Sequence, residues 1–308
     1  MELTGLQRKI VELKEEKNAL LLAHNYQIIE IQEIADFVGD SLELCRRAQS
    51  VEDRELIVFA GVDFMAETAS ILNPQKKVVI PSAEAICPMA AMLPLKTLKK
   101  MKEEHQGAPV VLYVNTLAEA KAEADVTCTS ANAAEIVAQL EGDTILFGPD
   151  VNLAWYVSQK VPEKTLVPVP DYGHCRVHRF LGDGSEAMEL KNKYPDAELL
   201  VHPECEPEFQ KKADFVLSTG GIYRRCKESS AKVFIIGTEV GMVDRLTREI
   251  PGKIFLPAKK YSECASMKRI TLENTYSSML NEAPVIHVPE EIAARARIPI
   301  QRMLEMSR

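Results

Sequence analysis

The sequence predicts an α/β protein made of three αβα sandwich domains related by a pseudo-threefold axis. Short β-branched segments alternate with helical patterns along the chain, which is typical of parallel sheets covered by helices on both faces. The same landmarks return at intervals of roughly 88 residues, which indicates an internal repeat. We therefore expect three short parallel sheets, with the functional site at their central junction.

The clearest part of the repeat is a set of three cysteines, Cys87, Cys175 and Cys264, which lie 88 and 89 residues apart. Each follows an apolar segment that ends in proline: KKVVIP, TLVPVP and KIFLP. Three thiols at the same point of three repeats converge if the repeats pack around one axis. We expect these cysteines to meet at the centre of the protein.

Two further sets of residues keep the same register. Three aspartates lie 89 residues apart, and a hydroxyl follows each of them by five residues. Three glycines are each followed two residues later by an acid. The aspartates are Asp36, Asp125 and Asp214, the hydroxyls are Ser41, Ser130 and Thr219, and the glycines are Gly61, Gly148 and Gly237. We interpret the aspartates as turn or capping residues and the glycines as tight strand-to-helix turns.

The first unit shows the order of elements expected in all three. Strands are expected at 20–24, 36–40, 56–61 and 76–81, and helices at 28–35, 41–49 and 64–72. The repeat divides the chain into domains at 1–84, 85–173 and 174–264. The tail, 265–308, breaks the repeat. We expect it to form a helix, a strand at 285–289 and a terminal helix, and to pack back on the first domain.

Composition restricts the class of protein. With 46% hydrophobic and 27% charged residues, the chain resembles an ordinary globular protein. No apolar run approaches the roughly 20 residues of a membrane helix, and the N-terminal pattern is a charged helix rather than a signal peptide. Seven cysteines without a secretion signal favour metal or catalytic use in a reducing compartment. The net charge of −8 argues against nucleic acid. We expect a cytoplasmic protein.

Polar side chains also follow the strands of each unit. Ligands of parallel sheets bind beyond the carboxyl ends of the strands, and the repeat identifies those positions. Twelve and ten residues before each repeated aspartate lie His24 and Tyr26, Tyr113 and Asn115, and His202 and Glu204. Ser41, Ser130 and Thr219 follow the second strand, at the expected N-cap of the next helix. One central pocket could gather all of these groups.

This inventory indicates a type of chemistry. Three thiolates, rather than four, leave one position of a metal ion or cluster open to substrate. Capped helix N-termini bind anions without lysine or arginine. Histidine and glutamate transfer protons, and tyrosine can donate one. Because an open iron polarises substrate oxygen, we expect elimination chemistry on a small anionic substrate.

Other interpretations stay open at this point. A zinc-dependent hydrolase could also use three thiolates and an open position. A cluster that only senses iron or oxygen would not need the proton-transfer groups, and a radical enzyme would need its cysteines close together in sequence. Each histidine or hydroxyl, taken alone, could be structural. Four cysteines outside the register are interpreted as core packing: Cys45, Cys128, Cys205 and Cys226.

Short motifs along the chain resemble one known family. They are AHNYQ at 23–27, GDS at 39–41, ICPMA at 86–90, YVNT at 113–116, TSAN at 129–132, GPDVNLA at 148–154, GHCRVH at 173–178, HPEC at 202–205, STGG at 218–221 and MKRITLEN at 267–274. Together they resemble quinolinate synthase, the A protein of bacterial and archaeal NAD biosynthesis. The resemblance covers essentially the whole chain.

The resemblance implies a cofactor and a reaction. Members of this family are triangular three-domain proteins that hold one oxygen-sensitive [4Fe-4S] cluster by three cysteines, which match Cys87, Cys175 and Cys264. They condense iminoaspartate with dihydroxyacetone phosphate and release quinolinate, phosphate and water, with the open iron assisting dehydration. The implied functional partner is an imine-producing aspartate oxidase or dehydrogenase. Neither nucleic acid nor membrane is implied.

The resemblance also implies roles for residues of the matching motifs. The implied substrate contacts are His24, Ser41, Tyr113, Asn115, Ser130, His202, Glu204 and Thr219. Glu204 and Tyr26 would be acid–base groups, and His24, His202 and Tyr113 would also take part in catalysis. His178, three residues after Cys175, is also expected to line the pocket.

Overall fold

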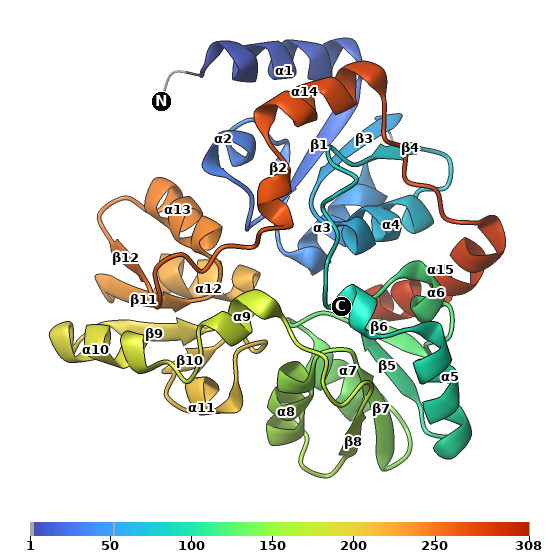
Figure 1. Ribbon diagram of the computed structural model, residues 1–308. Coiled ribbons are helices and arrows are strands. Elements are labelled where there is room, and N and C mark those ends of the chain that lie inside the picture. Colours follow the sequence, from blue (N-terminus) through green and yellow to red (C-terminus); the bar gives the residue numbers. More distant parts are fainter. Residues whose placement is uncertain (1–2, 52, 308) are drawn as a thin grey trace.

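The computed structural model describes residues 3–51 and 53–307. These residues form three four-stranded parallel sheets, which lie around a common centre (Figure 1). The sheets share one strand order, namely β2-β1-β3-β4, β6-β5-β7-β8 and β10-β9-β11-β12. Helices pack against each sheet. The predicted fold class, three related αβα units with short parallel sheets, is confirmed.

The first unit has the elements that its sequence predicts, within a few residues. Its strands are β1 (Ala19–His24), β2 (Phe37–Gly39), β3 (Leu56–Ala60) and β4 (Lys77–Val79). Its helices are α1 (Gly5–Glu16), α2 (Ile29–Gln32), α3 (Ser41–Ser50) and α4 (Asp63–Leu72). All six residues of β1 are buried, as expected for a central strand with helices on both faces.

The second and third units repeat this order. The strands of the second unit are β5 (Val110–Tyr113), β6 (Val126–Cys128), β7 (Thr144–Gly148) and β8 (Thr165–Pro168). Its helices are η1 (Ala90–Met92), α5 (Leu95–Glu104), α6 (Ala118–Lys121), α7 (Ala133–Gln139) and α8 (Val151–Lys160). The strands of the third unit are β9 (Glu198–Val201), β10 (Phe215–Val216), β11 (Val233–Gly237) and β12 (Ile254–Pro257). Its helices are α9 (Arg176–Phe180), α10 (Ser185–Lys193), α11 (Pro207–Gln210), α12 (Thr219–Glu228) and α13 (Val240–Glu249).

The three repeated aspartates fasten the central strands. A carboxylate oxygen of each one accepts the backbone N–H near the start of the first strand of its unit. The acceptor and donor pairs are Asp36 and Leu21 (2.8 Å), Asp125 and Val110 (2.7 Å), and Asp214 and Leu199 (2.7 Å). The backbone N–H of each aspartate donates back to the carbonyl of the same strand residue. Each aspartate thus binds a strand residue 15 positions earlier, and its interpretation as a turn or capping residue stays a prediction.

Three buried side chains, Gln32, Lys121 and Gln210, join the units in cyclic order. Each lies four residues before a repeated aspartate and donates to backbone carbonyls on both sides of a boundary between units. Lys121 Nζ donates to the Thr116 carbonyl at 2.6 Å and to the Phe64 carbonyl of the first unit at 3.3 Å. The corresponding contacts between units run from Gln32 to Gly241 (3.3 Å) and from Gln210 to Asn152 (3.4 Å).

The tail consists of η2 (Met267–Arg269), α14 (Leu272–Asn281) and α15 (Glu290–Met306). Helix α14 packs against α1, and α15 contacts β6 and α6 of the second unit as well as α4 of the first. The strand expected at 285–289 was wrong: Val285 makes one antiparallel bridge with Val79, between Pro284 and Pro289, which cannot donate to a ladder. The domain boundaries stay a prediction. No helix in the described part of the chain is long and apolar enough to cross a membrane.

The buried charge of Lys121 should make stability depend on pH. Burial lowers the pKa of Lys121 from 10.5 to about 8. An unfolded lysine keeps its usual pKa near 10.4, so between about pH 8 and 10 the unfolded chain binds more protons, and stability from this group rises with pH. We expect Lys121→Gln to lose more free energy of unfolding, relative to wild type, near pH 9.5 than near pH 7.5 in urea titrations.

Glutamine occupies the corresponding position in the other two units, which provides a matched comparison. Lys121→Met cannot donate at all and removes the side-chain donor of the Thr116 carbonyl, whereas the Phe64 carbonyl still accepts from the Thr68 hydroxyl. We expect it to be about 1–3 kcal/mol less stable than Lys121→Gln. Equal stability of these two variants, or a Lys121→Gln loss that is the same at both pH values, would contradict this account of the buried amine.

Candidate active site at the junction of the three units

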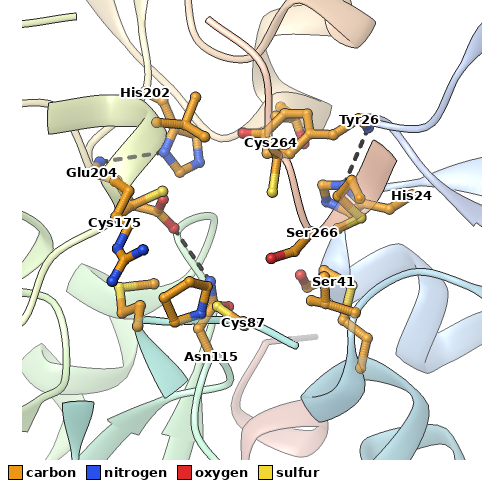
Figure 2. Close-up of a pocket in the computed structure, with 18 of the residues that line it drawn as sticks. His24, Tyr26, Ser41, Cys87, Asn115, Cys175, His202, Glu204, Cys264 and Ser266 are labelled. Atoms are coloured by element: carbon orange, nitrogen blue, oxygen red, sulfur yellow. Dashed lines mark hydrogen bonds between the residues drawn. The ribbon is translucent and has the colours of Figure 1, made fainter. Parts of the chain in front are cut away.

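A cavity of about 410 Å³ lies where the three units meet. Its walls come from the carboxyl ends of strands and the loops after them, and Figure 2 shows side chains of all three units facing one space. The lining includes each of the twelve residues that the sequence placed at the site: His24, Tyr26, Ser41, Cys87, Tyr113, Asn115, Ser130, Cys175, His202, Glu204, Thr219 and Cys264. The structure therefore brings the candidates together, and their roles stay predictions.

Cys87, Cys175 and Cys264 reach the cavity from the loops that follow β4, β8 and β12. Their thiols are free and half-buried, and they approach the space from different sides (Figure 2). Burial raises the pKa of each thiol, because a thiolate would lose its hydration there. A bound metal ion or cluster would supply the positive charge that stabilises three thiolates. The donor set fits a thiolate-bound metal centre.

A second group of possible metal ligands lies beside the first. Atoms of Cys175, His178 and Glu204 come within 4.8 Å of one another. However, Nδ1 of His178 faces Oε2 of Glu204 at 2.7 Å, and its Nε2 lies 2.8 Å from the hydroxyl of Thr238. Because both ring nitrogens have partners, we interpret His178 and Glu204 as a proton-transfer pair rather than as metal ligands.

A chain of close polar contacts connects two tyrosines through this pair. The hydroxyls of Tyr26 and Thr238 are 2.7 Å apart, and Thr238 contacts His178, which faces Glu204. On the other side of the carboxylate, the Tyr113 hydroxyl donates to Oε1 of Glu204 at 2.6 Å. Thr238, His178 and Glu204 are buried. The arrangement can move a proton between the cavity-lining phenol of Tyr26 and the carboxylate of Glu204.

The protonation states suit acid–base chemistry. Burial alone would raise the pKa of Glu204, but His178, His202 and the hydrogen bond from Tyr113 hold it well below its usual range. Burial raises the pKa of Tyr26 and of Tyr113, so both phenols keep their protons. At neutral pH the cavity therefore presents the ionised carboxylate of Glu204, which can accept a proton, near two phenols that can donate one.

His24 and His202 are neutral donors with fixed orientations. Burial lowers the pKa of each to about 3. In both rings Nδ1 accepts a backbone N–H two residues later, from Tyr26 at 3.2 Å and from Glu204 at 3.3 Å. A neutral ring that accepts at Nδ1 carries its proton on Nε2. Nε2 of His202 accordingly donates toward Ser130 at 3.2 Å, and Nε2 of His24 has its proton available.

The predicted N-cap positions of the hydroxyls were wrong. Asp40 caps α3 and Ser218 caps α12, so Ser41 and Thr219 are the first residues inside these helices. Ser130 lies two residues before Asn132, the residue at the cap position of α7. None of the three hydroxyls is therefore used to cap a helix. That of Thr219 accepts a hydrogen bond from Asn25 at 2.8 Å, which leaves its own proton to donate.

The sequence analysis missed several polar residues here, among them Asp40, Glu263 and Ser266 of the lining. Thr238 lies directly after Gly237, one of the repeated glycines, and only that register could have drawn attention to it. Arg176 follows Cys175 and is the one lysine or arginine in the cavity lining of the described residues. The sequence analysis based anion binding on helix N-termini, and Arg176 adds a cation to that site. His178, which was expected to line the pocket, is not among the lining residues. Arg176 is exposed and forms no ion pair within the described part of the chain.

Fold and cavity together define a triplicated α/β protein in which three thiols and candidate acid–base groups line one pocket. Residues 8–305 match the family described as Quinolinate synthetase A protein. The chain therefore belongs to this family, as the motifs of its sequence indicated.

Relatives of high identity extend over the full length of the chain. The quinolinate synthase of Methanothermobacter thermautotrophicus is 55% identical over 305 residues, which cover 99% of both chains. That of Thermococcus onnurineus is 54% identical over 309 residues and 100% of both chains. That of Thermotoga maritima is 45% identical over 298 residues, which cover 97% of this chain and 98% of the relative.

Proposed function

We propose that this chain is a quinolinate synthase, which condenses iminoaspartate with dihydroxyacetone phosphate to form quinolinate, phosphate and two waters in NAD biosynthesis. The observation that supports this most strongly is the convergence of three thiols with Glu204, Tyr26 and neutral histidine donors in one cavity of a chain that belongs to the family. An oxidase or dehydrogenase acting on aspartate would supply the imine.

We assign Cys87, Cys175 and Cys264 as the ligands of one [4Fe-4S] cluster per chain. Three thiolates from the loops after β4, β8 and β12 would leave the fourth iron open toward the polar wall of the cavity. When bound, such a cluster would supply a Lewis acid for a substrate oxygen or nitrogen. The protein contributes the loops that place the thiols and the acid–base groups opposite them.

Neutral donors would hold the anionic substrates. Nε2 of His24 and the hydroxyls of Ser41 and Thr219 can donate to carboxylate or phosphate oxygens without bringing a further charge into the cavity. Ser130, which contacts His202, and the amide of Asn115 supply polar groups on the opposite wall. Because hydrogen bonds to charged acceptors are stronger than neutral ones, a few such donors suffice to orient a small dianion.

Glu204 and Tyr26 would carry out the proton transfers. The ionised carboxylate of Glu204 can take a proton from a substrate carbon or nitrogen, and the Tyr113 hydroxyl and His178 stabilise its charge. The phenol of Tyr26 can protonate a departing hydroxyl and recover a proton through Thr238 and His178. Both water losses in the overall reaction need such a paired acid and base.

The role of Glu204 is tested by Glu204→Gln, which keeps the size of the side chain and removes the base. We expect quinolinate formation to fall at least about 10²-fold, because general base catalysis contributes roughly 10²–10⁴-fold. Iron and sulfide per chain should stay at the wild-type value, since Glu204 is not a ligand in this assignment. Near-normal turnover would remove Glu204 from the mechanism, and loss of iron would instead make it a ligand.

Arg176 should assist binding of the dianionic substrates rather than the proton transfers. We expect Arg176→Gln to raise KM about tenfold with little change in kcat, because a charge-assisted contact is lost equally from the substrate and the transition state. Arg179→Gln is the matched control: Arg179 is exposed on the same helix, α9, but lies outside the cavity lining and 4.0 Å from Glu206. Equal effects of the two substitutions on KM would mean that substrate binding responds to the net charge of the protein and not to Arg176 in particular.

A further inference from the structure

Three carboxylates outside the cavity lining contact the backbone of the cavity cysteines. They are the acids that follow the repeated glycines by two residues: Asp63, Asp150 and Glu239. One oxygen of each accepts the backbone N–H of a cysteine 24 or 25 residues further along the chain. The pairs are Asp63 and Cys87 (2.9 Å), Asp150 and Cys175 (3.2 Å), and Glu239 and Cys264 (3.0 Å).

A second hydrogen bond supports each of these contacts. At the start of the same helix, a backbone N–H donates to the carbonyl two residues before the cysteine. These bonds run from Asp63 to Ala85 (2.9 Å), from Val151 to Gly173 (2.9 Å) and from Val240 to Ser262 (3.0 Å). Each cysteine loop is thus held at two points to the end of the neighbouring strand, in the same way in all three units.

The carboxylates do not belong to the substrate pocket. Asp63, Asp150 and Glu239 are absent from the cavity lining, and Asp150 and Glu239 are fully buried. A buried carboxylate is costly unless hydrogen bonds compensate for its lost hydration. Asp150 and Glu239 use one oxygen for the cysteine and the other for a backbone N–H of their own helix, from Leu153 and Gly241. A carboxylate can accept these two hydrogen bonds on separate oxygens, whereas an amide or a hydroxyl offers only one oxygen.

The third carboxylate has an additional partner. Lys268 Nζ lies 2.9 Å from Oε1 of Glu239, the oxygen that accepts the Cys264 N–H. The same ammonium donates to the backbone carbonyl of Tyr26 at 2.7 Å. Glu239 therefore joins the Cys264 loop to the loop that carries Tyr26, whereas no described cation pairs with Asp63 or Asp150.

We propose that Asp63, Asp150 and Glu239 are positioning residues, which fix the three cysteine loops so that their thiols converge and retain an iron–sulfur cluster. The cluster itself rests on the proposed function. The fixed position of the loops does not, because it follows from hydrogen bonds between residues of the chain itself. Removal of one carboxylate should release one loop and leave the other two in place.

The test compares two aspartates of the second unit. Asp150→Val removes the acceptor for the Cys175 N–H. Asp125→Val is the matched control, since Asp125 accepts the Val110 N–H at the opposite end of the same sheet, away from the cysteines. Both variants lose a side-chain acceptor of a backbone N–H, from buried Asp150 or from exposed Asp125, so both should melt at a lower temperature. Only Asp150→Val should change the behaviour of Cys175.

The first readout is alkylation of the reduced, metal-free protein, followed peptide by peptide by mass spectrometry. We expect Cys175 of Asp150→Val to react about tenfold faster than in wild type, as loss of a buried hydrogen bond implies, with Cys87 unchanged as the internal reference. Asp125→Val should leave both rates unchanged. An unchanged Cys175 rate in Asp150→Val, or equal acceleration in the control, would overturn the proposal.

The second readout is the rate at which an iron chelator removes the cluster from anaerobically loaded protein. We expect Asp150→Val to lose iron about tenfold faster than wild type and Asp125→Val to match wild type. If Asp150→Val does not fold, Asp150→Asn, which keeps one acceptor oxygen, should give an intermediate rate. If wild-type protein takes up no cluster, the proposed cofactor is refuted. The positioning role is retained if Asp150→Val still selectively accelerates alkylation of Cys175.

Discussion

The common orientation of three parallel sheets is the constraint on which the rest of this protein depends. In a parallel sheet the strands end at one edge, and here the three edges face the same centre (Figure 1). Side chains that are 88 or 89 residues apart in sequence therefore meet in one cavity. The cyclic contacts of Gln32, Lys121 and Gln210 hold the units in that orientation, each by buried donors to backbone carbonyls.

The electrostatics of the cavity follow from burial. Neutral His24 and His202 donate hydrogen bonds without the desolvation cost of an imidazolium, and the backbone N–H at each Nδ1 fixes which nitrogen carries the proton. Glu204 is the exception, a buried carboxylate that remains ionised because His178 and Tyr113 surround it. Anion binding by an acidic protein is then reasonable, since the donors are mostly neutral and Arg176 stands among the lining residues.

Much of this organisation could be predicted from the sequence, because a repeat converts spacing into geometry. Cys87, Cys175 and Cys264, and the polar residues at equivalent strand ends, share one register, so a pseudo-threefold packing had to bring them together. The same register marked the acids after the glycines, but their contacts with the cysteine N–H groups depend on loop conformation, which spacing does not determine.

The sequence-based predictions that were wrong, and one residue that was missed, also have physical reasons. Asp40 and Ser41, like Ser218 and Thr219, are adjacent residues of types that both cap helices, and the local sequence does not decide which one takes the cap. Thr238 has no polar counterpart in the other units, where Val62 and Pro149 follow the repeated glycines. The segment at 285–289 is β-branched, yet its flanking prolines limit it to a single bridge with β4. In each case tertiary contacts decided between local alternatives.

We propose that three cysteines hold one cluster at the centre of the fold. The most direct test measures iron, acid-labile sulfide and zinc per chain in protein purified and kept without oxygen. Our account predicts about four iron and four sulfide per chain, with loss of both when Cys264 is replaced by serine. One zinc per chain without sulfide would contradict it and would favour a zinc-dependent hydrolase.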